Sequence, residues 1–225
     1  MLYELSHFIK ENLGFVWDAV EWGNAEVFAL MHKKELKDVS DILEKCSMGD
    51  FRVRMTLKED VEGLVRFFEE QPKEAFTFFK PHGFEAKSLG KVLRNKSFLT
   101  FVVTANETIV GYFFLRCFVN GKSFKGYIVD YRQRGKGIAK LQGITMNRIT
   151  EHLGLRMYAS ISPENMSSLA VASSVNDIKI IKTLKNGYYL IECSPKYKEF
   201  SGGGRQLSVK QMVMLFGERR LSHAA

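Results

Sequence analysis

Three apolar runs separated by two short turns constrain the fold of this chain more than any other part of its sequence. The runs are FLTFVVTA, TIVGYFFLRCFV and SFKGYIVDY, and all are rich in aromatic and β-branched residues, which favour strands. The tripeptide NET separates the first two runs, and Asn120-Gly121 separates the second from the third. Because Asn-Gly is the dipeptide most typical of a two-residue hairpin, these runs predict three consecutive antiparallel strands.

The segment from residue 51 to this meander predicts one strand and two helices. Residues 51–57, FRVRMTL, alternate apolar with polar side chains, as a half-buried strand requires. Thr56 and Glu59 have the spacing of a capping box, and apolar residues recur behind them at helical steps. Pro72 and the sequence KPHGF interrupt this pattern, and residues 86–93 then predict a short second helix.

Helices and strands alternate beyond the meander. A helix is expected between Ile138 and Gly154, and LRMYASIS predicts the strand that follows it. Met166 to Val175 predicts a short helix. The runs IKIIKTL and YYLIEC, joined by Asn186-Gly187, predict a second hairpin.

The two ends of the chain predict appendages to a central domain. From Leu2 to Cys46 apolar residues recur at helical steps, and with Gly14 and Gly23 as breaks we expect two or three short helices. SGGG at 201–204 predicts a flexible joint before an amphipathic piece at 209–216. We therefore expect a helical extension at 1–50, one domain at 51–195, and a tail or appended segment at 196–225.

The composition favours a globular protein with anionic partners. The 225 residues are 45% hydrophobic, and 33 Lys plus Arg against 25 Asp plus Glu give a net charge of +8. Three cysteines without a CxxC pair or zinc-site spacing predict reduced thiols, a cytoplasmic protein and no metal. No apolar run reaches the roughly 18 residues that span a bilayer, and no nucleic-acid-binding motif is visible. Neither a membrane nor a nucleic acid is therefore expected as a partner.

The stretch RQRGKGIAK, Arg132 to Lys140, places four cations and two glycines between the third meander strand and a helix. A glycine turn that opens a helix presents unpaired backbone N–H groups at the positive end of the helix dipole, and it leaves room for a phosphate. The stretch predicts an anion cradle, and the alternative is a solvated basic turn. A Walker loop is excluded because Arg116 stands where its first glycine must be, and RGKGIA lacks the GxGxxG spacing of a dinucleotide fold.

The order of these elements, with three short motifs, resembles the GCN5-related N-acetyltransferase (GNAT) family. Its acetyl-CoA signature, Gln or Arg, two residues, Gly, one residue, then Gly or Ala, is matched by Arg134, Gly137 and Ala139. Val129 stands five residues earlier, where the family usually has an apolar residue, and SPENMSSLA is similar to its second element. The resemblance covers about residues 51–195. It implies an α+β fold with a mixed, mainly antiparallel central sheet flanked by helices, here with an N-terminal helical extension.

The resemblance also implies an activity: an N-acetyltransferase that uses acetyl-CoA as co-substrate and moves the acetyl group directly to a primary amine. We expect a small-molecule amine, and an amino sugar or a nucleotide-linked substrate would suit the positive surface. The implied cofactor-binding residues are Ile128, Val129, Arg134, Gly135, Lys136, Gly137, Ile138, Ala139, Asn165 and Ser168. For Asn165 the alternative role is a helix cap. The C-terminal hairpin would also allow a homodimer.

Two departures from the family leave the catalytic groups open. Many members carry a tyrosine seven residues after the asparagine to protonate the leaving thiolate, and that position here is Ala172. Many also carry a glutamate base on the fourth strand, where SFKGYIV has no carboxylate. A non-catalytic acyl-CoA-binding regulatory module is therefore the alternative function.

Candidate replacements lie elsewhere in the sequence. His82 is a candidate base, because its unperturbed pKa near 6.5 suits an ammonium substrate, and the alternative is an exposed loop histidine. Asp130 is a second candidate, with neutralisation of Arg132 as the alternative, and Ser173 is a third, with helix packing as the alternative. We expect an acceptor pocket lined by aromatic side chains, which could instead cap a core; these are Phe78, Phe79 and Phe84.

Overall fold

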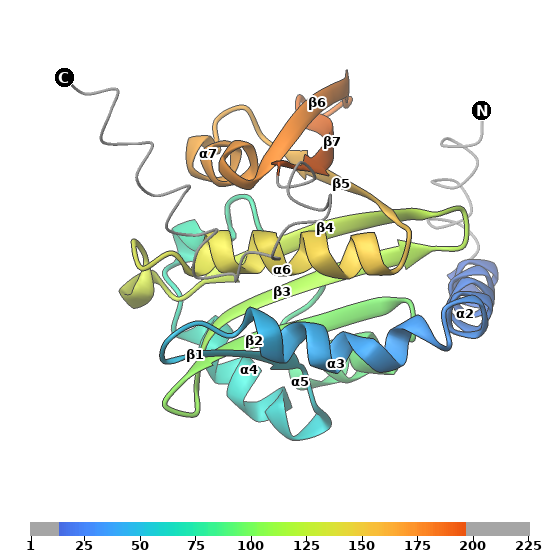
Figure 1. Ribbon diagram of the computed structural model, residues 1–225, viewed down its shortest axis with the longest axis horizontal. Coiled ribbons are helices and arrows are strands. Elements are labelled where there is room, and N and C mark those ends of the chain that lie inside the picture. The colour runs from blue at the N-terminus through green and yellow to red at the C-terminus, as the bar shows by residue number, and fades with distance from the viewer. Residues whose placement is uncertain (1–13, 197–225) are drawn as a thin grey trace, which may run out of the picture.

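The computed structural model describes residues 14–196 (Figure 1). The helix expected at 2–13, the joint at 201–204 and the amphipathic piece at 209–216 lie outside this range. Within it, a seven-stranded sheet runs through the middle of the molecule in the order β1-β2-β3-β4-β5-β7-β6. Helices cover both of its faces.

The strands confirm the predicted meander. Each strand pairs antiparallel with its neighbours except β4 and β5, which are parallel. The bounds are β1 (Phe51–Met55), β2 (Phe98–Ala105), β3 (Thr108–Phe118), β4 (Lys122–Val129), β5 (Arg156–Ile161), β6 (Asn176–Thr183) and β7 (Tyr189–Pro195). The β6–β7 hairpin turns at the predicted Asn186-Gly187, and β7 inserts between β5 and β6. The chain therefore has the mixed, mainly antiparallel sheet that the sequence predicts.

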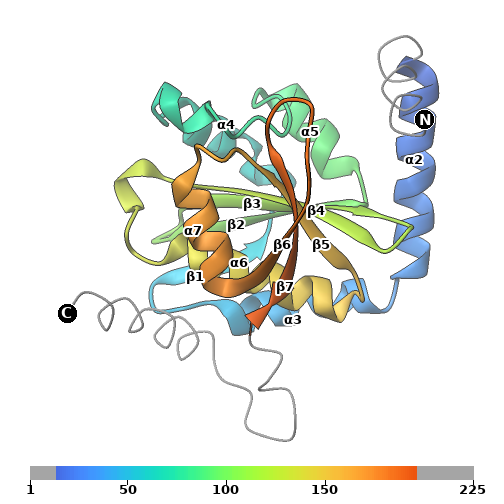
Figure 2. The same ribbon diagram turned by 90° about the horizontal axis from the view of Figure 1, so that it is seen from above.

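Six helices flank the sheet in the described range. They are α2 (Gly14–Met31), α3 (Glu35–Cys46), α4 (Val61–Glu69), α5 (Ala86–Arg94), α6 (Ile138–His152) and α7 (Met166–Val175). Helices α3 and α6 lie on one face of the sheet, and α4 and α5 lie on the other (Figure 2). Three short 3-10 turns complete the order: η1 (Lys58–Asp60), η2 (Lys73–Phe76) and η3 (Tyr131–Gln133). None of the helices between residues 14 and 196 is both long and apolar enough to cross a membrane.

Two hydrophobic cores follow from the alternation of side chains along the central strands. Phe113 and Leu115 of β3 point into a large core under α3 and α6, whereas Tyr112 and Phe114 point into a smaller core under α4 and α5. Half of the residues in the smaller core are aromatic, and the rings of Phe68 and Phe84 stack in it with centroids 4.3 Å apart. Both faces of the middle of β3 are thus removed from water.

The region before residue 51 belongs to the same packing unit as the sheet. Helix α3 buries Val39, Leu43 and Cys46 in the large core. Helix α2 is fixed to the end of β3 by Asn24, whose amide nitrogen donates to the Cys117 carbonyl at 3.0 Å. Residues 14–46 and the sheet therefore share a core, while the domain boundaries at 50 and 195 stay a prediction.

Two local predictions are wrong. Helix α2 continues through Gly23, because glycine within a helix weakens it without ending it. Thr56 and Glu59 do not form a capping box: the Thr56 hydroxyl is buried without a hydrogen-bond partner. The Asp60 carboxylate instead accepts from the Leu57 backbone N–H at 2.7 Å and pairs with Arg54 at 2.6 Å.

Substitutions at two glycines test this packing. A Cβ at Gly111 of β3 would lie 2.6 Å from the Gln142 amide nitrogen of α6, so we expect Gly111→Ala to lower the free energy of unfolding by about 1–3 kcal/mol. A Cβ at Gly23 would meet nothing within 4 Å, so Gly23→Ala should raise it by about 0.5–1 kcal/mol. Urea denaturation measures both. Equal stability of the two variants would contradict the close contact between α6 and β3.

Candidate functional site

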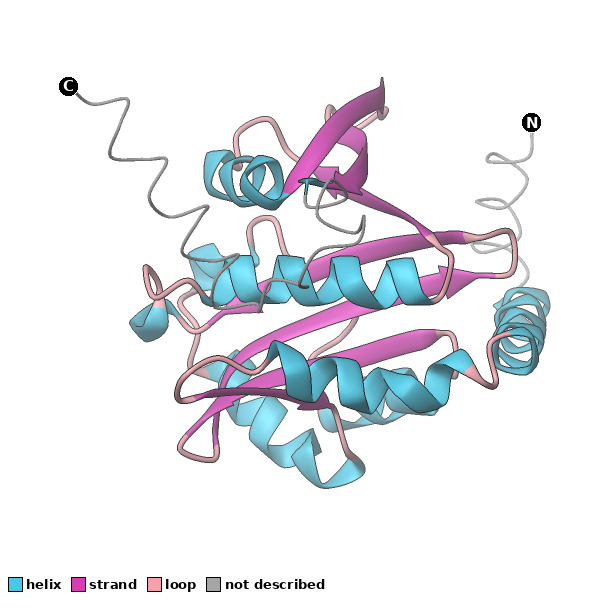
Figure 3. Ribbon diagram, viewed as in Figure 1, coloured by secondary structure: helices cyan, strands magenta, loops and turns pink. Residues whose placement is uncertain are grey.

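A cleft opens in the sheet where β4 and β5 part. Within the described chain these parallel strands pair at three positions, Lys122 with Arg156, Ser123 with Met157, and Phe124 with Tyr158. Beyond them β4 pairs only with β3, as far as Val129, and β5 pairs only with β7, as far as Ile161. Figure 3 shows β5 rising away from β4. Two backbone edges therefore face each other across the cleft without pairing.

The cleft is a cavity of about 930 Å³, within the range usual for small-molecule sites. Its walls are residues 125–129 of β4, residues 159–162 at the end of β5, and the first two turns of α7. The turn at 133–140 closes one end, and Phe78 and Phe79 also line the cavity, with Phe79 packed against the smaller core under α4 and α5. All ten residues that the sequence assigns to cofactor binding line this one cavity.

The turn between β4 and α6 has the backbone geometry of an anion site. Gly135 and Gly137 have φ angles of 81° and 83°, a left-handed conformation that side chains disfavour, and α6 begins at Ile138. The backbone N–H groups of the first turn of a helix have no partner within the helix, and the helix dipole is positive there. Ile138 is buried in the large core and anchors the turn to the sheet. The site can therefore bind a phosphate group.

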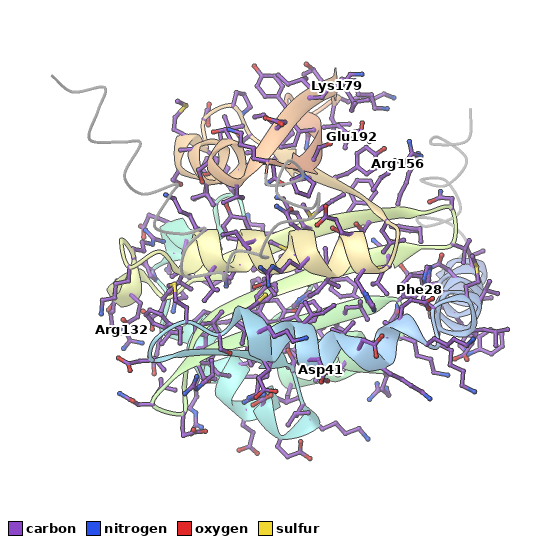
Figure 4. The ribbon with its side chains drawn as sticks, in the orientation of Figure 1. Phe28, Asp41, Arg132, Arg156, Lys179 and Glu192 are labelled. Carbon is purple, nitrogen blue, oxygen red and sulfur yellow. The ribbon has the colours of Figure 1, made fainter. Side chains whose placement is uncertain are left out.

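Asp130 has a structural partner at the start of this turn. Its carboxylate accepts from the Arg132 backbone N–H at 2.8 Å and from the Arg132 guanidinium at 2.8 Å, and these bonds keep the pKa of Asp130 below its usual value despite burial. Arg132, labelled in Figure 4, also pairs with Glu70. Asp130 is buried and does not line the cleft. The geometry therefore favours the alternative role of Asp130, which is to neutralise Arg132. The catalytic role of Asp130 stays a prediction.

The opposite wall of the cleft begins with a helix cap. The Asn165 side chain accepts from the Ser168 backbone N–H at 3.1 Å and from the Ser167 hydroxyl at 3.0 Å, so it caps α7 while it lines the cavity. The Ser168 hydroxyl lies 3.5 Å from the Tyr127 hydroxyl of β4. Tyr127 therefore reaches from one wall of the cleft to the other.

His82 packs among aromatic rings of the smaller core and does not line the cleft. The Nδ1 of His82 lies 2.8 Å from the Gly83 carbonyl, and Nε2 lies 2.9 Å from the Tyr112 hydroxyl. Since a carbonyl only accepts, Nδ1 carries the proton and Nε2 accepts from Tyr112. Burial lowers the pKa of His82 and raises that of Tyr112, which favours this neutral pair. Neither residue lines the cavity, so the lone pair of His82 faces a phenol rather than the cleft.

The remaining candidates divide between the cleft and the core. Phe78 and Phe79 line the cleft, whereas Phe84 does not and packs in the smaller core. The Ser173 hydroxyl donates to the Ala170 carbonyl of its own helix at 3.2 Å and lies outside the cavity lining. Ala172, where a tyrosine was expected, is buried. The catalytic role of Ser173 stays a prediction, and the position of Ser173 outside the cavity lining does not favour it.

Two residues that the sequence reasoning did not single out line the floor of the cleft. Lys125 and Tyr127 belong to the β4 run SFKGYIV, and both point toward the side of α6 and α7. Lys125 is only 8% exposed. A lysine in the middle of a strand that is buried on both faces was the available signal, because lysine is almost never fully buried without a role or a partner.

Comparison with known proteins supports the fold. No protein-family model matches the sequence, and no curated protein matches it either. RimJ of Mycobacterium smegmatis, solved with CoA-disulfide, matches with a TM-score of 0.57 and 17% identity over 74% of this chain and 89% of its own. The PaiA N-acetyltransferase of Thermoplasma acidophilum, solved with coenzyme A, matches with a TM-score of 0.55 and 16% identity, over 66% of this chain and 99% of its own. AAC(6')-Ib, solved with paromomycin and acetyl-CoA, matches with a TM-score of 0.54 and 12% identity, over 70% of this chain and 100% of its own.

The chain has the GNAT fold. The expected fold class, a mixed and mainly antiparallel sheet flanked by helices, is therefore confirmed. In this GNAT fold the parting of β4 from β5 and the glycine turn before α6 belong to one continuous cavity.

The pH dependence of stability tests the neutral pair of His82 and Tyr112. Because the pKa of His82 is lower in the folded chain than the unfolded value of about 6.5, its contribution is complete above that pH and is lost as the pH falls. We expect the free energy of unfolding of the wild type, minus that of His82→Gln, to decrease between about pH 7 and pH 5. The subtraction removes the titration of the other histidines. A difference that grows on acidification would contradict the assignment.

Proposed function

We propose that this protein is an acetyl-CoA-dependent N-acetyltransferase that acts on a primary amine of a small molecule. One observation carries the proposal: an unpaired edge of β4 leads directly to a glycine turn at the start of a helix, inside a single cavity. A ligand with a chain of amides at one end and phosphates at the other matches this arrangement: the amides can pair with the edge of β4, and the phosphates can bind at the glycine turn. Coenzyme A thioesters have this form.

The phosphate end of the ligand would bind at the turn. Backbone N–H groups at 134–139, helped by the dipole of α6, would hold the pyrophosphate. Arg134 and Lys136 line this end of the cavity and add positive charge. Arg132 is held by two carboxylates, so it contributes mainly to the shape of the turn.

The pantetheine arm would extend along β4. Residues 125–129 pair with β3 on one side and leave the other edge open to the cavity. An extended ligand with amide groups can add to such an edge as an extra strand. Ile128 and Val129 would then contact the part of the arm next to the phosphates, and a backbone N–H nearer Lys125 would point at the thioester oxygen and stabilise the negative charge that develops there.

The reaction needs no covalent intermediate with the protein. The neutral amine attacks the thioester carbon, the new N–C bond forms, and the C–S bond breaks. The nitrogen loses one proton and the departing thiolate gains one, so the products are an amide and a free thiol. The chain's own contribution is to hold both reactants in line, which is worth large effective molarities.

The proposed class of acceptor follows from the residues on the opposite wall of the cavity. Phe78 and Phe79 offer apolar surface for a ring or a carbon skeleton, and Glu74 is a carboxylate that can attract an ammonium group. An amino sugar, alone or linked to a nucleotide, combines an amine with a ring and, in the second form, with phosphates suited to the basic turn. The structural neighbours leave the acceptor open, since one was solved with the aminoglycoside paromomycin and others are named for ribosomal proteins.

Cofactor binding is tested by one substitution with two controls. Gly137→Glu puts bulk and negative charge where the phosphates would bind, so we expect calorimetry to show at least about 100-fold weaker binding of acetyl-CoA. Gly137→Ala, which keeps the unfavourable φ of 83° without the charge, should lose much less. Gly23→Glu changes the net charge equally on a distant helix and should bind as the wild type does. Unchanged affinity in Gly137→Glu would refute the site.

Turnover is tested with a panel of amines. Amino sugars, amino sugar nucleotides, aminoglycosides, polyamines and peptides with a free N-terminus are each incubated with acetyl-CoA, and release of the thiol is followed. We expect the sugar amines to react fastest. Reaction of peptides or polyamines alone would refute the proposed acceptor class, and binding of acetyl-CoA without turnover on any amine would favour the non-catalytic binding module.

A further inference from the structure

A buried lysine lies at the closed end of the cleft. Lys125 is the first residue of β4 beyond the three positions at which β4 and β5 pair, and it is only 8% exposed. No carboxylate in residues 14–196 forms an ion pair with it. A buried ammonium without a counter-charge is costly, so this placement calls for a functional reason.

The faces of the strands show where the Lys125 side chain points. Ser123 pairs with Met157, and Met157 pairs with Cys193, so these three share a face of the sheet. Lys125 follows Ser123 by two residues and points to that face, where its amino group lies near the Cys193 thiol. The same face of β4 carries Tyr127. Helix α7 presents no ionisable residue here, and Glu192 of β7 points to the other face, toward Tyr158.

The distance along β4 from the glycine turn to Lys125 matches the length of the pantetheine arm. From Val129, beside the glycine turn, back to Lys125 is a span of four residues, about 13 Å of extended strand. The pantetheine arm from the phosphate oxygen to the sulfur has about twelve bonds, equal to about four residues of extended backbone. An arm that runs along β4 from the turn therefore ends with its sulfur at Lys125.

We propose that Lys125 is the acid that protonates the departing thiolate of coenzyme A. The inference rests on the proposed function and deepens it. As the C–S bond of the thioester breaks, the Lys125 ammonium gives one proton to the sulfur and becomes a neutral amine. The proton lost by the acceptor nitrogen returns to Lys125 through water in the open cleft, so the cycle closes without another reactant.

The chemistry favours Lys125 over its neighbour Tyr127. Burial lowers the pKa of Lys125, which makes the ammonium a better proton donor, whereas burial raises the pKa of Tyr127, which makes the phenol a poorer one. A thiol has a pKa of about 8.5, so proton transfer from a phenol with a raised pKa is uphill. A positive charge beside the sulfur also stabilises the thiolate before the proton moves, which a neutral phenol cannot do.

The ionisation of bound coenzyme A tests the proposal without any turnover. The thiolate absorbs in the ultraviolet, and a difference spectrum against the complex with desthio-coenzyme A cancels the protein's own thiols. We expect the thiol of coenzyme A to have a pKa at least about one unit lower when bound to the wild type than when bound to Lys125→Met. Lys122→Met, which removes the same charge from the same strand outside the cavity, should behave as the wild type.

Kinetics provide the second measurement. Lys125→Met keeps the length of the side chain and removes only a buried charge, so it should fold, and we expect kcat to fall about 100-fold with little change in KM for acetyl-CoA. Tyr127→Phe should keep most of kcat. Equal thiol pKa values in wild type and Lys125→Met, or a larger loss in Tyr127→Phe, would overturn the inference while leaving the proposed function intact. Absence of coenzyme A binding to the wild type would overturn both.

Discussion

The parting of two parallel strands is the constraint on which the rest of this structure depends. A backbone edge removed from water needs hydrogen-bond partners, and β4 and β5 supply each other with partners at only three positions. Beyond these positions β5 leaves β4 while its other side stays paired with β7 as far as Ile161. The cavity between them is therefore lined by peptide groups that a ligand can satisfy. A chain-like molecule with its own amides, such as the proposed coenzyme A thioester, would meet that requirement.

Helix α6 fixes the glycine turn relative to this gap. It is buried along most of its length, and its Gln142 amide donates to the Ile128 carbonyl at 3.2 Å and to the Tyr112 carbonyl at 3.4 Å. The side chain thus ties the helix to both β3 and β4, and Gly111 provides the space for it. A turn held in this way presents its N–H groups without a further loss of conformational entropy on binding. Preorganisation of the proposed phosphate site is consequently a property of the core.

The two faces of the sheet carry different chemistry. The face under α4 and α5 is aromatic and holds the neutral pair of His82 and Tyr112, with Phe79 reaching the cleft. The face under α6 and α7 carries Lys125, Tyr127 and Cys193, three ionisable groups whose pKa values burial shifts. In the proposed reaction the first face meets the acceptor and the second meets the leaving group. In that proposal the attacking amine and the departing thiolate lie on opposite sides of one gap.

The sequence by itself determined the meander, both Asn-Gly hairpins, the helices on either side and the glycine turn, because each depends on periodicity or backbone preferences within a few residues. Through the resemblance of its motifs to the GNAT family, the sequence also predicted that Arg134 to Ala139, Asn165 and Ser168 belong to one site, and these residues line one cavity. Only the tertiary structure decided that α3 joins the core, that His82 faces Tyr112, and that Asp60 rather than Glu59 caps the first turn. The same holds for Lys125, whose burial depends on β5, β7 and α7 packing around it. These outcomes involve residues distant in sequence, and a local pattern carries no information on which partner a side chain will meet.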